Sequence, residues 1–319
     1  MFASSTLSAQ QWAAYDSEGF IDLGRVIAAE GVTKLRQRAD DLSLGIVENP
    51  QIEMQLDTGG PYDALAGVVP QFDQKTLLYR KIQGLQHDAL FGSILRRPLW
   101  RSIAGKVYGP HASVSLFRAM IMNKPANQGT ILPWHQDGGE VWAVDRDPLV
   151  TVWIALDSAT VANGCVEVIP GSHRLGLLSA YGSTLGDLDV QQHCPSERVQ
   201  QLEVEEGHAI LMHNWLIHRS GVNRTGSPRR AFTFCMMDGR TTSTLTGDHY
   251  PMLFGAPPAV EPYVHQLRID LAALREQRAD AERYALSLRA ANSVLEESIA
   301  TATAYARSLE GELARRPPA

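Results

Sequence analysis

Cysteine is scarce in this sequence. Its three cysteines, Cys165, Cys194 and Cys235, are widely spaced along a chain of 319 residues. Disulfide frameworks and cysteine-based metal sites need more cysteines at short, regular spacings, so neither is expected here. We interpret the three as reduced thiols, mostly buried, in a cytoplasmic protein.

Long hydrophobic runs and an excess of positive charge are also absent. No stretch approaches the ~18 apolar residues of a membrane helix, and the N-terminus lacks the basic start and apolar run of a signal peptide. The 35 acidic residues outnumber the 29 basic ones, giving a net charge of -6, whereas nucleic-acid binding normally needs clustered positive charge. We therefore expect neither a membrane nor a nucleic-acid partner. The 44% of hydrophobic residues is enough for one sizeable core.

Residues 133–142 contain a histidine and a carboxylate two positions apart. On an extended strand the side chains of His135 and Asp137 leave the same side of the backbone and can converge on one point. Nitrogen and oxygen ligands with positions left open are typical of non-haem Fe(II) and not of a closed structural zinc site. The pair alone is equally explained as the polar end of a strand. A metal site is therefore predicted only if a third ligand is found.

The third ligand is expected within residues 211–234. His218 ends an apolar run and is followed by Ser220 and then by Arg229, which opens a predicted strand. The guanidinium of Arg229 offers a bidentate fork for the remote carboxylate of a 2-oxo acid whose other end chelates the metal. His213 competes for the ligand role. We prefer His218 as the ligand, because Ser220 and Arg229 follow it at the spacings expected for such a site.

The strand that begins at Arg229 has two different faces. Alternation places Arg229 with the small residues Ala231 and Thr233, and Arg230 with two phenylalanines. The small neighbours leave space for a cofactor, whereas the phenylalanines suit packing under helices. Only Arg229 is therefore expected to enter the interior of the barrel.

Several motifs together resemble the phytanoyl-CoA dioxygenase family of Fe(II)- and 2-oxoglutarate-dependent oxygenases. The resemblance covers about residues 8–240. The matching pieces are Tyr15-x3-Gly19-Phe20, Asn123-Lys124-Pro125, His135-Gln136-Asp137, Trp153-Ile154-Ala155-Leu156, Asn163-Gly164-Cys165, Pro170-Gly171-Ser172-His173 and His218-x-Ser220-Gly221-x-Asn223.

The resemblance implies a set of site residues. It implies His135, Asp137 and His218 as iron ligands, with contacts to 2-oxoglutarate from Arg229 and Ser220. The residues implied as further lining of the cosubstrate site are Lys81, Met120, Gln136 and Trp153.

The reaction implied is hydroxylation of an aliphatic C–H bond, with release of succinate and carbon dioxide from 2-oxoglutarate and O2. We expect the substrate to be a small-molecule or carrier-linked metabolite. Because Asp137 is present, the open chloride position of related halogenases is not available, while desaturation, ring formation and epimerisation stay open. The candidates for substrate contact are Glu140, Trp142 and Arg146, in a loop that is equally explained as a surface loop with one tucked tryptophan.

Two other classes of function remain. One is a non-catalytic metal- or ligand-binding barrel that acts as a scaffold, and the intact ligands and Arg229 count against it. The other is a metal-binding sugar isomerase or cupin-like enzyme, which has no need of Arg229.

The chain from residue 112 onward favours a β-rich fold. Short apolar or alternating runs are separated by turn signals, as in a double-stranded β-helix, the jelly-roll of cupin-like proteins. Helices are predicted to flank it, at 9–17 after the N-cap Ser8 and at 28–44. Residues 48–75 have no sustained period and are either disordered or a lid over the substrate. We assign residues 1–262 to the dioxygenase domain.

Residues 263–319 differ in composition and form a second predicted domain, a C-terminal coiled-coil helix. Apolar residues recur every seven positions in two rows, which is typical of a coiled coil. We expect a homodimer or a coiled-coil partner, and a helix pair folded onto the catalytic domain is the alternative. The two rows are Leu267, Leu274, Ala281, Leu288, Leu295, Ala302 and Leu309, and Leu271, Arg278, Ala285, Asn292, Ile299, Ala306 and Leu313.

Overall fold

The computed structural model describes residues 6–57, 75–179, 181–257 and 262–314. The chain divides into two compact units, Met1–Ala259 and Val260–Ala319. Most of the predicted lid falls on residues outside the described ranges. Of its flanks, Glu53–Leu56 forms a strand.

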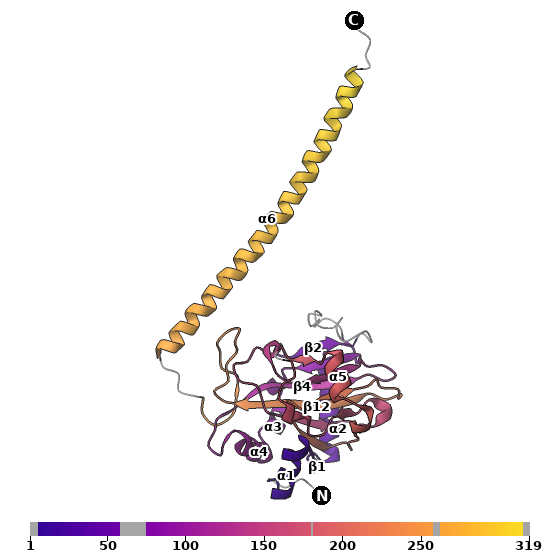
Figure 1. The fold of residues 1–319 in the computed structure, drawn as a ribbon, viewed down its shortest axis with the longest axis vertical. Coiled ribbons are helices and arrows are strands. Elements are labelled where there is room, and N and C mark those ends of the chain that lie inside the picture. The colour runs from indigo at the N-terminus through magenta and orange to yellow at the C-terminus, as the bar shows by residue number, and fades with distance from the viewer. Residues whose placement is uncertain (1–5, 58–74, 180, 258–261, 315–319) are drawn as a thin grey trace. The chain divides into compact units, whose positions relative to one another are not determined.

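Helices and strands alternate irregularly along the first unit (Figure 1). The helices are α1 (Ala9–Glu18), α2 (Ala29–Ser43), α3 (Ala89–Leu95), α4 (Pro98–Tyr108), α5 (Asp187–His193) and, in the second unit, α6 (Pro262–Ala314). The strands are β1 (Phe20–Arg25), β2 (Glu53–Leu56), β3 (Tyr79–Gln83), β4 (Val114–Lys124), β5 (Leu132–Gln136), β6 (Val150–Ala155), β7 (Val166–Val168), β8 (Ser183–Thr184), β9 (Gln200–Leu202), β10 (His208–His213), β11 (His218–Ser220), β12 (Arg229–Asp238) and β13 (Met252–Phe254).

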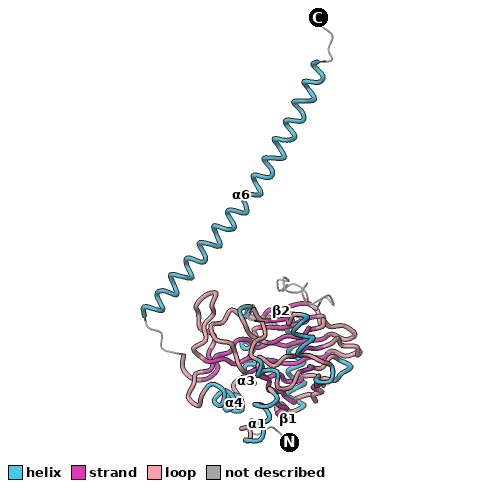
Figure 2. The backbone as a smooth tube through the Cα atoms, in the orientation of Figure 1, coloured by secondary structure: helices cyan, strands magenta, loops and turns pink. Residues whose placement is uncertain are grey.

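Two antiparallel sheets make up the first unit, and Figure 2 shows their strands running through its centre. Among the described residues, the larger sheet has the order β1-β10-β6-β12-β4-β3-β2, and β13 also pairs with β4. The smaller sheet has the order β8-β5-β11-β7-β9. The predicted mainly β fold with flanking helices is confirmed.

Alternating side chains explain how the layers stack. On β12, Phe232 and Phe234 point into a core shared with α2, α3 and α4, whereas Ala231 joins a second core shared with the smaller sheet. On β6, Ile154 and Trp153 divide in the same way. The larger sheet is therefore buried on both faces, by helices on one side and by the smaller sheet on the other.

The N-terminal helices begin and end as the sequence predicts. Ser8 caps α1 through a capping box with Gln11, and Gly19 ends the helix in the left-handed conformation. Helix α2 covers all but the ends of the predicted 28–44 segment and buries Val32 and Leu35 against the larger sheet.

Helix α6 is a single long helix whose described side chains are mostly exposed. Along the described part of the predicted seam, the larger apolar residues are all solvent-accessible: Leu267, Leu271, Leu274, Leu288, Leu295 and Ile299. The structure therefore shows a long C-terminal helix, while its pairing as a coiled coil stays a prediction. Among the described residues, no helix is long and apolar enough to span a membrane.

An ion network fastens α2 to the sheets. Arg230 on β12 faces the helices, where its guanidinium pairs with Asp157 at 2.8 Å and with Asp40 of α2 at 2.8 Å. Arg36, also on α2, reaches Asp157 at 2.9 Å. The side chains of Arg230, Asp157 and Asp40 are 11%, 17% and 33% exposed, so the pair of Arg230 with Asp157 is the better shielded of the two.

We expect Arg230→Ala to lower the free energy of unfolding by about 3 kcal/mol, because it removes the ion pair of Asp40 and leaves Asp157 paired with Arg36 alone. Chemical denaturation measures this. Arg240→Ala is the control: Arg240 pairs with Asp238 on the surface, and its loss should leave stability unchanged. An Arg230→Ala protein as stable as the parent would show that the network contributes nothing.

Candidate active site

Pairing between β5 and β11 sets two histidines opposite each other. His135 and His218 are direct partners in the antiparallel register, and their ring centroids lie 4.0 Å apart. Asp137 follows β5 directly, and its backbone N–H donates to the carbonyl of Asn214 at 2.8 Å. One ligand atom from each of His135, Asp137 and His218 lies within 4.8 Å of the others. Among the described residues, this is the one cluster of its kind.

Both histidines are oriented by their own backbone. Nδ1 of His135 lies 2.8 Å from the carbonyl of Pro133, and Nδ1 of His218 lies 2.8 Å from that of Leu216. Because a carbonyl can only accept, each Nδ1 carries the proton and each Nε2 keeps its lone pair for the cluster. Burial, together with the neighbouring His218, lowers the pKa of His135 to about 3, so the ring is neutral at physiological pH.

His213 lies in a different group of side chains. Its Nδ1 accepts a hydrogen bond from the backbone N–H of Trp215 at 3.1 Å, and its ring lies 5.1 Å from that of His173. Burial and His173 lower the pKa of His213 to about 4. The structure thus brings His218, and not His213, to Asp137, and it places His173 beside His213 and not at the cluster.

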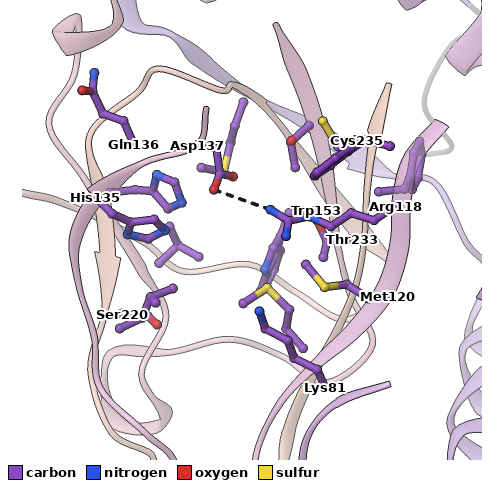
Figure 3. A pocket seen from close by; sticks show the side chains of 18 of the residues that line it. Lys81, Arg118, Met120, His135, Gln136, Asp137, Trp153, Ser220, Thr233 and Cys235 are labelled. Carbon is purple, nitrogen blue, oxygen red and sulfur yellow. Dashed lines mark ion pairs between the residues drawn. The ribbon is translucent and has the colours of Figure 1, made fainter. Parts of the chain in front are cut away.

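A cavity of about 300 Å³ opens between the two sheets at this cluster (Figure 3). The smaller sheet supplies His135, His218 and Ser220, while the larger sheet supplies residues of β3, β4, β6 and β12. The cavity therefore joins the two histidines and Asp137 to the side of β12 that carries Arg229.

Arg229 is a buried cation without an anion. Its Nη2 donates to the carbonyl of Gly164 at 2.9 Å, its Nε has no hydrogen-bond partner, and it forms no ion pair with a described carboxylate. Burial lowers its pKa to about 10. Gly164 has a φ of 76°, and a Cβ there would lie 2.6 Å from the carbonyl oxygen of Gly221, so only glycine fits the turn that supports Arg229. A buried unpaired guanidinium is costly unless an anion joins it.

The residues implied as cosubstrate lining lie around the same cavity. Met120, Trp153 and Ser220 line it, and the ring of Trp153 lies 5.6 Å from the Arg229 guanidinium. Lys81 points into it from β3 (Figure 3) and has no hydrogen bond to a described residue. Burial and the nearby Arg118 and Arg80 lower the pKa of Lys81 to about 7.

Gln136 lines the cavity differently, because its amide points away from it (Figure 3). The amide nitrogen donates to the carbonyls of Gly176 and Trp215 at 2.8 and 2.7 Å, and the oxygen accepts from Leu178 at 2.9 Å. These hydrogen bonds hold the side chain of Gln136 in the wall of the cavity.

The three residues predicted to contact substrate have different positions. Trp142 lines the cavity, whereas Glu140 and Arg146 are not part of its lining. Glu140 is exposed, and Arg146 pairs with Asp145 at 2.9 Å and donates to the carbonyl of Arg240. Val141 lines the cavity as well.

Sequence reasoning missed Arg118 of β4. It points into the cavity with its Nη2 3.9 Å from the Asp137 carboxylate, the pair joined by the dashed line in Figure 3. A usable signal existed, because Arg118 is two residues before Met120 and therefore shares its face of the strand. Phe117, which also lines the cavity, has no such signal.

Two solved structures illustrate the likeness in fold. EctD from S. alaskensis with bound Fe is 21% identical, with a TM-score of 0.56 over 79% of this chain and 82% of that one. The non-heme alpha ketoglutarate dependent carbocyclase SnoK from nogalamycin biosynthesis is 19% identical, with a TM-score of 0.57 over 82% and 96% of the two chains. At these identities the likeness shows the fold alone.

Two sequence relatives carry the same family name. A probable phytanoyl-CoA dioxygenase of Caenorhabditis elegans is 26% identical over 239 residues, 72% of this chain and 75% of the relative. The phytanoyl-CoA dioxygenase of Arabidopsis thaliana is 24% identical over 263 residues, 75% and 91% of the two chains. The family model for phytanoyl-CoA dioxygenase matches residues 15–231. The chain therefore belongs to the phytanoyl-CoA dioxygenase family.

Proposed function

We propose that this protein is a non-haem Fe(II)- and 2-oxoglutarate-dependent dioxygenase that hydroxylates an aliphatic C–H bond of a small-molecule or carrier-linked metabolite. The observation that carries the proposal is the joint placement, in one cavity, of a His-Asp-His cluster and a buried Arg229 that lacks a counter-ion. Family membership supports it. One related solved structure is of EctD with 2-oxoglutarate and 5-hydroxyectoine.

The donor set fits Fe(II). His135, Asp137 and His218 would hold the ion through two imidazole nitrogens and one carboxylate oxygen, the donor set typical of non-haem iron oxygenases. When bound, the iron with 2-oxoglutarate and O2 supplies the oxidation of the C–H bond and releases succinate and carbon dioxide.

Arg229 fits the remote carboxylate of 2-oxoglutarate. Its unpartnered Nε lies in the cavity wall, where a carboxylate that loses its water needs a paired cation. Ser220 contributes a hydroxyl on the opposite sheet, and Trp153 and Met120 provide apolar walls that exclude water. Lys81 supplies a further cation facing the same space.

The other functions are less well supported. A scaffold has no use for an unpaired buried guanidinium, and a metal-dependent isomerase has no use for a second carboxylate site. Desaturation and ring formation use the same metal ligands as hydroxylation, so the substrate determines which of these reactions takes place.

The metal assignment predicts that His218→Ala loses Fe(II) binding and turnover, because it removes one of three ligands. His213→Ala is the matched control and should keep Fe(II) affinity, since His213 contacts Trp215 and His173 and not the cluster. Anaerobic Fe(II) titration by calorimetry measures both. Loss of binding in His213→Ala alone would reverse the assignment.

The cosubstrate assignment predicts that Arg229→Ala keeps Fe(II) but binds 2-oxoglutarate about a hundredfold more weakly or worse, because breaking a buried charged pair costs about 3–5 kcal/mol. Anaerobic titration of 2-oxoglutarate into the Fe(II) protein, followed by metal-to-ligand charge-transfer absorbance, measures it. Arg230→Ala, on the opposite face of β12, should leave this affinity unchanged. The same assay tests the function itself: an Fe(II) protein that shows no charge-transfer band, and forms no succinate in O2, is not such a dioxygenase.

We further propose that residues 263–319 form a homodimeric coiled coil, in a chain whose catalytic domain ends near residue 262. The exposed seam of α6 supports this, because a long apolar row is unstable in water without a partner.

Light scattering should show a dimer for the full chain and a monomer for a chain ending at Pro262. Leu288→Glu, which charges the seam, should dissociate the dimer. Leu286→Glu, which charges an equally exposed leucine outside the two rows, should not. If the full-length protein is also a monomer, either the coiled-coil prediction is wrong or the partner of the helix is another chain.

A further inference from the structure

The cavity carries more positive charge than the proposed iron and cosubstrate neutralise. Its charged lining residues, among those described, are one carboxylate, Asp137, and the cations Arg80, Lys81, Arg118, Arg219 and Arg229. A divalent metal, the dianion of 2-oxoglutarate, Asp137 and Arg229 cancel one another. Of the other cations, Arg80 hydrogen-bonds Gln55 at 3.2 Å, and the charges of Arg118 and Arg219 remain to be balanced.

Arg219 is already neutralised on the wall of the cavity. Its Nε pairs with Glu167 at 2.7 Å, and its guanidinium lies 4.5 Å from the ring of Trp134. Among the described residues, Arg118 has no comparable partner. Its contact with Asp137 is long, at 3.9 Å, and Asp137 is needed by the metal.

Aromatic rings hold Arg118 in place. Phe117 and Trp142 stack with their centroids 4.6 Å apart and their planes within 10°. The Arg118 guanidinium lies 4.1 Å from the centre of the Trp142 ring and 5.0 Å from that of Phe117. This cation–π contact fixes the guanidinium without using its hydrogen-bond donors. The donors stay free for a ligand.

The position of Arg118 suits a substrate and not the cosubstrate. Its side chain is 29% exposed, whereas Arg229 is buried. An incoming molecule therefore meets Arg118, and one bound to it lies beside Asp137 and thus beside the metal.

We propose that Arg118 is the anchor for an anionic group of the substrate, a carboxylate or a phosphate, and so selects an anionic substrate class. This inference rests on the proposed function. The fork of donors matches both kinds of oxyanion, and Lys81, on the neighbouring strand β3 of the same sheet, adds a further hydrogen-bond donor to the cavity.

The test uses three probes that share one ring: para-fluorophenylacetate, para-fluorophenyl phosphate and the uncharged para-fluorophenylacetamide. The full-length protein is loaded anaerobically with Fe(II) and saturating 2-oxoglutarate. Fluorine NMR line widths then report binding and nearness to the paramagnetic iron. At least one anion should bind about tenfold more tightly than the amide or better, and the stronger anion identifies the substrate group.

Variants separate an anchor from a structural role. Arg118→Gln should weaken anion binding to the level of the amide while leaving Fe(II) affinity and the charge-transfer band unchanged. Arg118→Lys should give an intermediate affinity, since the ammonium keeps the charge but loses the fork. Arg219→Gln, which removes a paired arginine of the same cavity, should bind the anions as the parent does.

Three results would overturn the inference while the charge-transfer band is intact. They are equal binding of amide and anions, no binding of any anion, and parent-like anion binding in Arg118→Gln. Loss of Fe(II) affinity in Arg118→Gln would also overturn it, because Arg118 would then act by positioning Asp137. Absence of the band from the parent would overturn the proposed function as well.

Discussion

The short pairing between β5 and β11 is the constraint on which the rest of the site depends. It sets His135 and His218 opposite each other in one register, and a slip of one residue would turn one of the two rings to the other face of the sheet. Strand β11 also pairs with β7, so the register is held from both sides. The carbonyl that orients His135 belongs to Pro133 within β5, and the one that orients His218 belongs to Leu216, just before β11. Ring orientation is thus fixed by backbone geometry before any metal is bound.

Two adjacent arginines on β12 illustrate how stability and function divide across one strand. Arg230 faces α2 and is paired with Asp40 and Asp157, so it stabilises the fold. Arg229 faces the cavity and has no carboxylate partner among the described residues, so in the ligand-free state it costs free energy. Binding of an anion would relieve this cost, which makes the fold itself more stable when the site is filled.

Much of the placement of the site residues can be predicted from the local sequence. Alternation alone separates Arg229 from Arg230, and the spacing of His135 and Asp137 holds because the chain runs extended into the turn that follows β5. The substrate-facing loop is different. Residues Glu140–Trp142 form a 3-10 turn, after which Ala143 has a φ of 52°. Such a turn sends neighbouring side chains in unrelated directions, so residue type within 138–146 does not tell which of them reaches the cavity.

Arg118 shows why contacts between distant segments are hardest to foresee. The face of β4 on which Arg118 lies can be predicted. Its free donors, however, depend on the contact with Trp142, in a separate loop, and on there being no second carboxylate partner among the described residues. Both conditions are products of the sandwich, which brings β4 and that loop to the same edge of the cavity. A strand rule can predict that a charge enters a cavity. Only the side chains that surround it in the folded protein show whether that charge is already neutralised, and hence whether it is available to a ligand.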